Sequence, residues 1–132
     1  MSAQRRLDIQ TDADASRAAL EATQYSMAAG FDETPSRLIA TAVSELARNI
    51  LKYAGSGEMR LRQVEGPNGR GIEIKAVDRG PGIEEIEAAM RDHFSSGGTL
   101  GLGLPGVKRM MDEFLIESAP GEGTRVTAVK WI

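Results

Sequence analysis

Residues 34–55 read TPSRLIATAVSELARNILKYAG and carry the strongest helical signal in the chain. Thr34 offers an N-cap hydroxyl, Pro35 suits the first helical position, and Gly55 follows the last periodic residue. Apolar side chains recur every three or four positions as a stripe formed by Ile39, Val43, Leu46, Ile50 and Tyr53. We therefore predict a long amphipathic helix with one face on a hydrophobic core.

The chain before this helix predicts one strand and a further helix. Residues 5–10 are short and partly alternating, which favours an opening strand at the edge of a sheet. From Asp12 the sequence becomes alanine-rich, with small and aromatic side chains at helical spacing until Gly30. We expect this first helix to end at Gly30, shortly before the long helix begins.

The chain after the long helix predicts two hairpins separated by helical and glycine-rich segments. The expected elements, in order, are strands at 59–64 and 71–77, a short helix at 83–91, a glycine-rich loop at 93–103, a helix with Val107, Met110, Met111 and Phe114, and strands at 115–118 and 124–131. We therefore expect a single domain over residues 1–132. Its fold class is an α/β two-layer sandwich, with a mixed, largely antiparallel sheet of about five strands and helices on one face.

The composition limits the chemistry that this domain can carry. The chain has no cysteine and a single histidine, His93, which excludes disulfides, thiolate metal sites and a histidine-rich zinc site. A net charge of -3 gives no basic footprint for nucleic acid or an anionic membrane. No apolar run approaches the ~20 residues of a membrane span, and the N-terminus lacks a signal-peptide pattern, so we expect a cytoplasmic protein.

Three polar side chains of the long helix share one narrow stripe beside its apolar face. Glu45, Asn49 and Lys52 stand at positions i, i+4 and i+7, which brings them to one side of the helix. They combine a carboxylate that can accept a proton, an amide oxygen suited to a hard cation and an ammonium suited to phosphate. This stripe is typical either of a ligand site at the border of the core or of a solvated helix face.

Glycine-rich segments later in the chain offer further site residues. Asp78 directly follows a strand in the run Asp78-Arg79-Gly80-Pro81-Gly82, where its carboxylate can accept a hydrogen bond from an exocyclic amine or bond its own backbone in a tight turn. Residues 95–105 are rich in glycine and precede a helix, whose exposed N–H groups would bind phosphate unless the segment is only a surface loop. Residues 121–124 close the last hairpin and place Thr124 at its end.

These blocks occur in the order and spacing of the GHKL ATPase superfamily, which includes gyrase, Hsp90, histidine kinases and the bacterial anti-sigma-factor serine kinases. Residues 45–49 resemble the N box, 78–82 the first glycine box, 97–104 the second glycine box with its lid, and 121–124 the last glycine-threonine element. The small size and the stretches around the N box and the second glycine box make the whole chain similar to the RsbT-type switch kinases of the stressosome.

The resemblance implies an ATP-binding Bergerat fold with a phosphate end on the long helix. Asn49 would hold a Mg²⁺ that bridges the phosphates, and Lys52 would contact phosphate. Glu45 would act as the general base that takes the proton of a serine hydroxyl on a bound protein. The glycine-rich segment would contribute the further ATP-binding residues Gly98, Gly101, Leu102, Gly103 and Leu104.

The same resemblance implies an adenine end at the first glycine box. Asp78 would receive the adenine amine with the help of Thr124, and Gly80 and Gly82 would let the base pack against backbone. The family's substrates are serines of STAS-domain proteins, and release from such a partner lets the kinase activate a downstream effector such as a PP2C-type phosphatase. We therefore predict an ATP- and Mg²⁺-dependent protein serine kinase and partner switch with no nucleic-acid or membrane partner.

Other interpretations of the same residues stay open. The chief alternative is a non-catalytic binding module that uses nucleotide only to set its shape and that sequesters a regulatory partner. A severed histidine-kinase catalytic domain is a further alternative, but the sequence lacks the helical hairpin that carries a phosphoacceptor histidine. A plain structural domain would leave the clustered glycines unexplained, because each glycine costs backbone entropy on folding.

Overall fold

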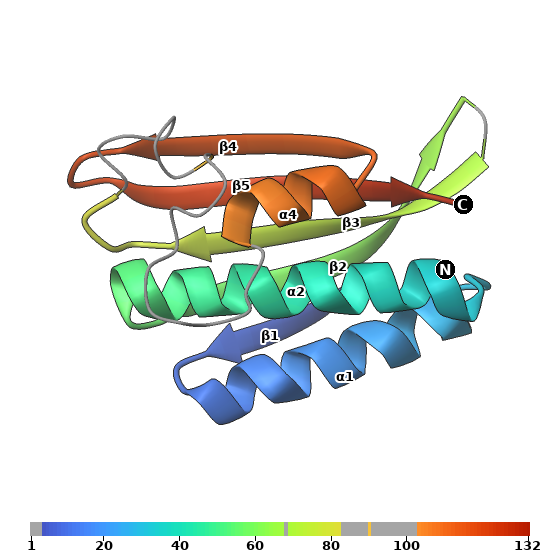
Figure 1. Ribbon diagram of the computed structural model, residues 1–132, viewed down its shortest axis with the longest axis horizontal. Coiled ribbons are helices and arrows are strands. Elements are labelled where there is room, and N and C mark those ends of the chain that lie inside the picture. The colour runs from blue at the N-terminus through green and yellow to red at the C-terminus, as the bar shows by residue number, and fades with distance from the viewer. Residues whose placement is uncertain (1–3, 68, 83–89, 91–102) are drawn as a thin grey trace.

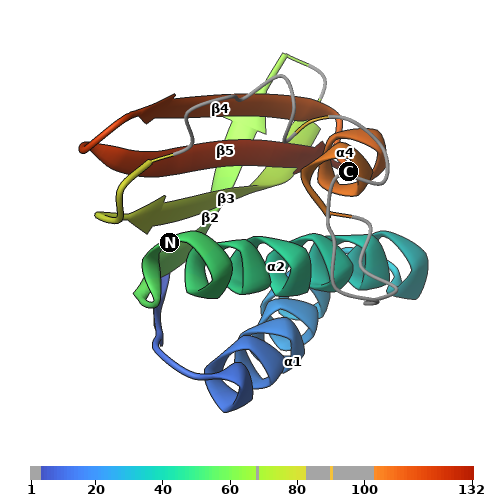
Figure 2. The same ribbon diagram turned by 60° about the vertical axis from the view of Figure 1, so that its left-hand side comes forward.

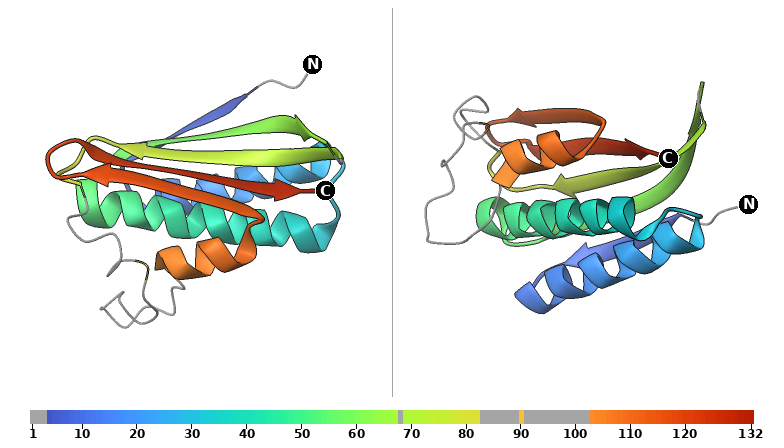
Figure 3. Two further views of the ribbon diagram at one scale, coloured as in Figure 1. Left: turned by 90° about the horizontal axis from the view of Figure 1, so that it is seen from above. Right: turned by 45° about the vertical axis from the view of Figure 1, so that its right-hand side comes forward.

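The protein folds as two layers, one sheet and one layer of helices (Figure 1). The computed structural model describes residues 4–67, 69–82, 90 and 103–132. The described strands are β1 (Arg5–Ile9), β2 (Gly57–Gly66), β3 (Gly69–Asp78), β4 (Glu113–Ala119) and β5 (Gly123–Trp131). The described helices are α1 (Asp12–Ala28), α2 (Glu33–Ala54) and α4 (Gly103–Met110), and all of them lie on one face of the sheet (Figures 2 and 3). The predicted two-layer α/β sandwich is therefore confirmed.

The strand order places the ends of three strands side by side. The sheet runs β1-β2-β3-β5-β4, and every pairing among the described strands is antiparallel. β5 lies between β3 and β4, so Thr124 pairs with Asp78 on one side and with Ser118 on the other. Asp78 thus meets Ser118 and Thr124, which lie at least 40 positions later in the chain, at one end of the sheet.

The hydrophobic core fills the space between the sheet and the helices. Alternate side chains of the strands point toward the helices and pack against the apolar stripe of α2. The helix α2 runs along the sheet (Figure 1). The predicted stripe is buried at Ile39, Val43, Leu46 and Ile50, with Tyr53 half-buried. Because α2 is buried along this stripe, its neighbouring polar stripe lies at the border of the core.

Small side chains allow α1 to lie directly against α2. The buried face of α1 includes Ala15, Ala18 and Ala22. A capping box starts the helix: Asp14 N donates to Thr11 Oγ1 at 3.2 Å, while Thr11 N donates to Asp14 Oδ2 at 3.1 Å. Backbone N–H groups that donate to its carboxylate lower the pKa of Asp14 below its ordinary value. Among the described residues, no helix is long and apolar enough to cross a membrane.

The start of α2 corrects one prediction and its end confirms another. Asp32, not Thr34, is the N-cap residue, and the helix begins at Glu33. Thr34 and Pro35 lie inside the first turn, where a proline is tolerated because these N–H groups have no partner within the helix. Gly55 ends the helix in the left-handed conformation, at φ 82°, as its position in the sequence predicts.

The segment after α4 corrects a second prediction. Phe114 lies in strand β4, because α4 already ends at Met110. The chain joins β5 directly afterwards: Asp112 N donates to Val129 O at 2.9 Å, and Glu113 pairs with Val129. The predicted hairpins are confirmed, although β2 and β3 are longer than expected. The helix expected at 83–91 and most of the expected glycine-rich loop lie outside the described residues.

Trp131 reports on the integrity of the sheet. Its indole lies against the glycines of the β2–β3 hairpin, since an ideal Cβ at Gly71 would approach Trp131 Cε3 to 2.6 Å. The indole Nε1 donates to Glu113 Oε2 at 2.6 Å. This side chain is the single tryptophan of the sequence, so its fluorescence follows the packing of three strands.

Truncation of one core leucine should destabilise the protein far more than truncation of an exposed one. Leu46 is 1% exposed and Leu20 is 59% exposed. We expect Leu46→Ala to lower the free energy of unfolding by about 2–5 kcal/mol, because it removes buried methyl groups and leaves a cavity. Leu20→Ala should change it by less than about 0.5 kcal/mol. Urea unfolding followed by Trp131 fluorescence measures both, and equal effects would contradict the placement of α2.

Candidate functional site

Asp78 is the buried acid at the centre of the candidate site. It is the last residue of β3 and only 5% exposed. Its Oδ1 accepts hydrogen bonds from Gly80 N at 3.0 Å and from Thr124 N at 3.2 Å. Asp78 therefore does bond its own backbone, but no hydrogen bond among the described residues uses Oδ2. One oxygen fixes the carboxylate, and the other stays available to a ligand.

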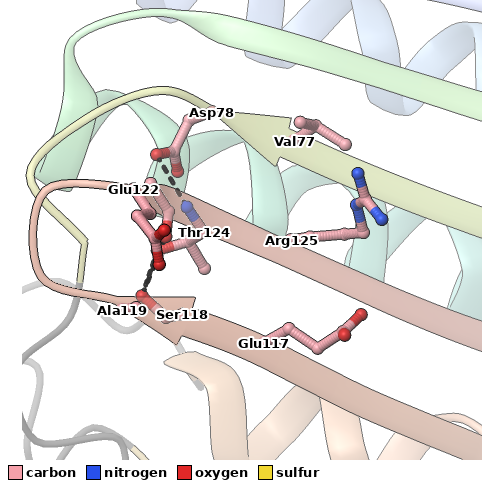
Figure 4. Close-up of a pocket in the computed structure, with 9 residues that line it drawn as sticks. Val77, Asp78, Glu117, Ser118, Ala119, Glu122, Thr124 and Arg125 are labelled. Carbon is pink, nitrogen blue, oxygen red and sulfur yellow. Dashed lines mark hydrogen bonds between the residues drawn. The ribbon is translucent and has the colours of Figure 1, made fainter.

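Thr124 and Ser118 continue this polar cluster across the sheet. Thr124 is 5% exposed and faces the helices. Ser118 Oγ donates to Gly123 O at 3.1 Å and lies 2.8 Å from Thr124 Oγ1 (Figure 4). Ser118 was not predicted from the sequence. Its signal was a polar residue that alternates with Phe114 and Ile116 on the core face of a strand.

Close backbone contacts explain the glycines around Asp78. An ideal Cβ would lie 2.5 Å from Ala54 Cβ if placed on Gly80, and 2.2 Å from Ala119 O if placed on Gly82. The loop after Asp78 is thus held between the end of α2 and the β4–β5 turn. Both glycines were expected to make room for a nucleotide base. In this structure the chain itself already requires them, and contact with a base stays a prediction.

The carboxylate of Glu45 lies at the beginning of α4. Glu45 Oε2 accepts a hydrogen bond from the backbone N of Gly103 at 3.1 Å, although the two residues are 58 positions apart. Gly103 is the first residue of α4 and has a φ of 63°. Because the N-terminus of a helix carries a partial positive charge, it attracts a carboxylate or another anion. This contact brings together the N box and the second glycine box.

The rest of the polar stripe lies along the C-terminal half of α2. Asn49 is half-buried, and no hydrogen bond among the described residues involves its carboxamide. Lys52 is exposed, with Nζ 5.3 Å from the centre of the Tyr53 ring. Burial raises the pKa of the Tyr53 hydroxyl. The stripe therefore holds a carboxylate, an accessible amide and a cation on consecutive turns.

The second glycine box is described only in part. Gly103 contacts Glu45, whereas Leu104 is buried in the core at 3% exposure. Gly98, Gly101 and Leu102 lie outside the described residues, so their expected contacts with phosphate stay predictions. Of residues 97–104, the structure describes Gly103 and Leu104, in the first turn of α4.

The described residues fit a metal ion that binds together with a phosphate ligand better than a metal ion that the protein holds alone. They contain no group of three or more His, Cys, Asp or Glu side chains that could hold a metal. Asn49 and Glu45, one turn apart, can supply at most a few oxygen atoms. Mg²⁺ commonly takes one or two protein oxygens and completes its shell with phosphates and water. The expected role of Asn49 is compatible with this chemistry.

The two contact regions lie at a fixed separation along α2. Glu45 contacts the start of α4, and Ala54 contacts the loop after Asp78. Ala54 lies nine positions after Glu45 in the helix, which corresponds to ~14 Å along the axis. The site therefore suits an elongated ligand with an anionic group at one end and a hydrogen-bond donor at the other.

A cavity of about 370 Å³ lies beside the Asp78 cluster. Asp78, Ser118 and Thr124 line it together with Val77, Glu117 and Arg125, which belong to the helix-free face of the sheet (Figure 4). The lining of this cavity therefore combines side chains from both faces of the sheet.

Substitution of two turn glycines should separate the effect of backbone conformation from that of close contact. Gly82 and Gly121 have φ values of 83° and 80°, but an ideal Cβ at Gly121 meets nothing within 4 Å. We expect Gly121→Ala to destabilise the protein by about 1–2 kcal/mol through backbone strain alone. Gly82→Ala should cost a further ~1–3 kcal/mol because its Cβ collides with Ala119 O. Denaturant titrations check this, and equal losses would refute the close contact.

Comparison with known proteins identifies the family to which this chain belongs. A sequence profile of the histidine kinase-, DNA gyrase B- and HSP90-like ATPases matches residues 34–131. This region runs from the first turn of α2 to the end of β5 and contains every candidate site residue.

Individual relatives cover most of the chain. Serine/threonine-protein kinase RsbT of Bacillus subtilis (strain 168) is 52% identical over 103 residues, which are 78% of this chain and 77% of that protein. The anti-sigma F factor of Thermoanaerobacter sp. (strain X514) is 35% identical over 98 residues, or 71% of this chain and 68% of its own length. The anti-sigma F factor of Clostridium beijerinckii (strain ATCC 51743 / NCIMB 8052) is 33% identical over 97 residues, 70% of this chain and 68% of that protein. The chain therefore belongs to the histidine kinase-, DNA gyrase B- and HSP90-like ATPase family, the GHKL superfamily that its sequence motifs resemble.

Proposed function

We propose that this protein is an ATP-dependent protein serine/threonine kinase that acts as a partner switch. It would phosphorylate a serine of a STAS-domain regulatory protein in the cytoplasm and, once released, activate a downstream effector such as a PP2C-type phosphatase. Its similarity to a protein named serine/threonine-protein kinase and to anti-sigma F factors supports this proposal. The observation that carries this proposal is the hydrogen bond from Gly103 N to the Glu45 carboxylate. It places a group that can accept a proton next to the backbone N–H groups at the start of α4.

The adenine end of the nucleotide would lie at Asp78. The Oδ2 atom would accept a hydrogen bond from the exocyclic amine, because Oδ1 is already held by two backbone N–H groups. Thr124 would help to fix the base from the neighbouring strand. Burial of both side chains strengthens such hydrogen bonds, since water competes less for them.

The phosphate end would lie along the polar stripe of α2 and the start of α4. Asn49 would hold a Mg²⁺, which when bound neutralises charge on the phosphates. Lys52 is exposed and its flexible side chain could contact phosphate as a point charge. The backbone N–H groups at the start of α4 would bind phosphate oxygens, helped by the helix dipole.

Glu45 would serve as the general base of the transfer. As the substrate serine oxygen forms its bond to the γ-phosphorus, its proton passes to Glu45, the bond from that phosphorus to the bridging oxygen breaks, and ADP leaves. Oε2 carries the hydrogen bond from Gly103, so we assign the proton to Oε1. The Gly103 contact would hold the carboxylate in place for this step, and positioning of this kind supplies much of the catalysis in phosphoryl transfer.

Variants of the α2 stripe test the kinase activity directly. With labelled ATP and a cognate STAS protein, Glu45→Gln should lose about 10²–10⁴-fold in rate, because a carboxamide cannot take the proton. Asn49→Ala should also lose transfer. Glu33→Gln is the matched control, because this exposed glutamate at the start of α2 pairs only with nearby Arg37 among the described residues. Full activity of Asn49→Ala would refute the metal role, and nucleotide binding by the wild type without any transfer would support the binding module instead.

A substitution at Asp78 tests the orientation of the nucleotide. The substitution Asp78→Asn keeps an oxygen that can accept from the N–H groups of Gly80 and Thr124. It replaces Oδ2 by an amide nitrogen, which cannot accept a hydrogen bond from the adenine amine. We expect calorimetry with ATP and Mg²⁺ to show affinity at least about tenfold weaker, as for loss of a hydrogen bond to a charged group. Asp8→Asn, at an exposed position of β1, is the control. Unchanged affinity of Asp78→Asn would contradict the proposed orientation.

A further inference from the structure

A hydroxyl pair on neighbouring strands extends the Asp78 cluster by one residue that the proposed function does not use. Asp78, Thr124 and Ser118 are successive cross-strand neighbours on β3, β5 and β4. All three side chains lie on the helix face, in line with the core residues Ala76 and Val126 of the same strands. A ligand that contacts Thr124 therefore meets a hydroxyl that is already hydrogen-bonded to Ser118.

The number of protons favours one direction for the hydrogen bond between the two hydroxyls. A hydroxyl has one proton to donate, and a carbonyl oxygen can only accept. The proton of Ser118 Oγ goes to Gly123 O at 3.1 Å. Either hydroxyl could donate in the 2.8 Å contact between Ser118 Oγ and Thr124 Oγ1, but only donation by Thr124 lets both contacts of Ser118 form at once. In that arrangement Thr124 keeps only acceptor capacity for a ligand.

Asp78 presents the same kind of group to the site. Its Oδ1 is occupied by two backbone N–H groups, so the ionised carboxylate offers Oδ2, again an acceptor. Both Asp78 and Thr124 are only 5% exposed, so a ligand that covers these acceptors must supply donors to them, because an acceptor that is buried without a donor is unfavourable. A ligand edge with two N–H hydrogens on one atom satisfies both, whereas a carbonyl at that place satisfies neither.

We propose that Ser118 is a positioning residue that selects a 6-amino purine over a 6-oxo purine by keeping the Thr124 hydroxyl an acceptor toward the base. This inference rests on the proposed nucleotide site and adds the origin of its base selectivity. Without the Ser118 hydroxyl, the Thr124 proton loses its acceptor and rotates. Thr124 can then donate toward the ligand, and the site no longer opposes a carbonyl as strongly.

Binding of three nucleotides to the full chain tests the proposal. We suggest calorimetry with Mg²⁺ and ATP, purine riboside triphosphate, in which hydrogen replaces the amine, and ITP, in which a carbonyl replaces it. For the wild type, both analogues should bind at least about tenfold more weakly than ATP. In Ser118→Ala, both of these differences should shrink by about three- to tenfold.

Two matched variants separate selectivity from a structural effect. Ser118→Thr keeps a hydroxyl on the strand and should keep the wild-type selectivity. Thr127→Ala removes a hydroxyl from the helix-free face of β5, where it pairs with Leu115, and should leave the ratios unchanged. Trp131 fluorescence confirms that each variant is folded. A merely structural role of Ser118 would weaken all three nucleotides equally and leave the ratios as they are.

The outcomes distinguish this inference from the proposed function. If the wild type binds ATP and Ser118→Ala keeps both ratios within about twofold, the role of Ser118 is overturned while the nucleotide site stands. If the wild type binds none of the three nucleotides, the proposed function itself fails, and the inference with it.

Discussion

One carboxylate oxygen, Asp78 Oδ1, ties together the parts of the chain on which the site depends. It accepts N–H groups from the loop that follows β3 and from the neighbouring strand β5. These bonds orient the side chain, and the surrounding glycines allow the loop to lie directly against α2 and the β4–β5 turn. The acid is therefore rigid before any ligand arrives, which lowers the entropy lost on binding.

The helix α2 provides both the core and the site because its two stripes are adjacent. Its apolar side chains lie on the sheet, and this packing fixes the rotation of the helix about its own axis. Glu45 and Asn49 must then emerge at the border between the sheet and α4. Packing and the candidate site are thus coupled in one element, because a change that rotates α2 would move the Glu45 carboxylate away from Gly103.

The sequence predicted most of this fold because its strongest signals are local. Helical periodicity identified α2 and Gly55 marked its end, but the N-cap was misplaced because a proline is accepted at several positions of a first turn. Phe114 was assigned to a helix because its spacing from Val107 fits a helical period as well as its true place in a strand. Boundaries of this kind depend on pairing with β5, which the local sequence does not encode.

The site could be predicted only as far as its residue types are distinctive. Glu45, Asn49, Asp78 and Thr124 were predicted as site residues from helical spacing, glycine clusters and the family resemblance, and their roles stay predictions. Ser118 was missed because its importance comes from its register with Thr124, and strand register is invisible in a single sequence. The contact between Glu45 and Gly103 likewise joins positions that only the tertiary structure brings together.

The helix α2 also fixes the distance between the two regions that contact it at Glu45 and at Ala54. An α-helix has a fixed rise and does not stretch, so the start of α4 and the Asp78 loop cannot approach one another to suit a shorter molecule. A ligand one phosphate shorter could keep its place at Asp78 and yet fail to reach the other end. The length of α2 would thus let the protein distinguish ADP from ATP without a side chain that serves only this distinction.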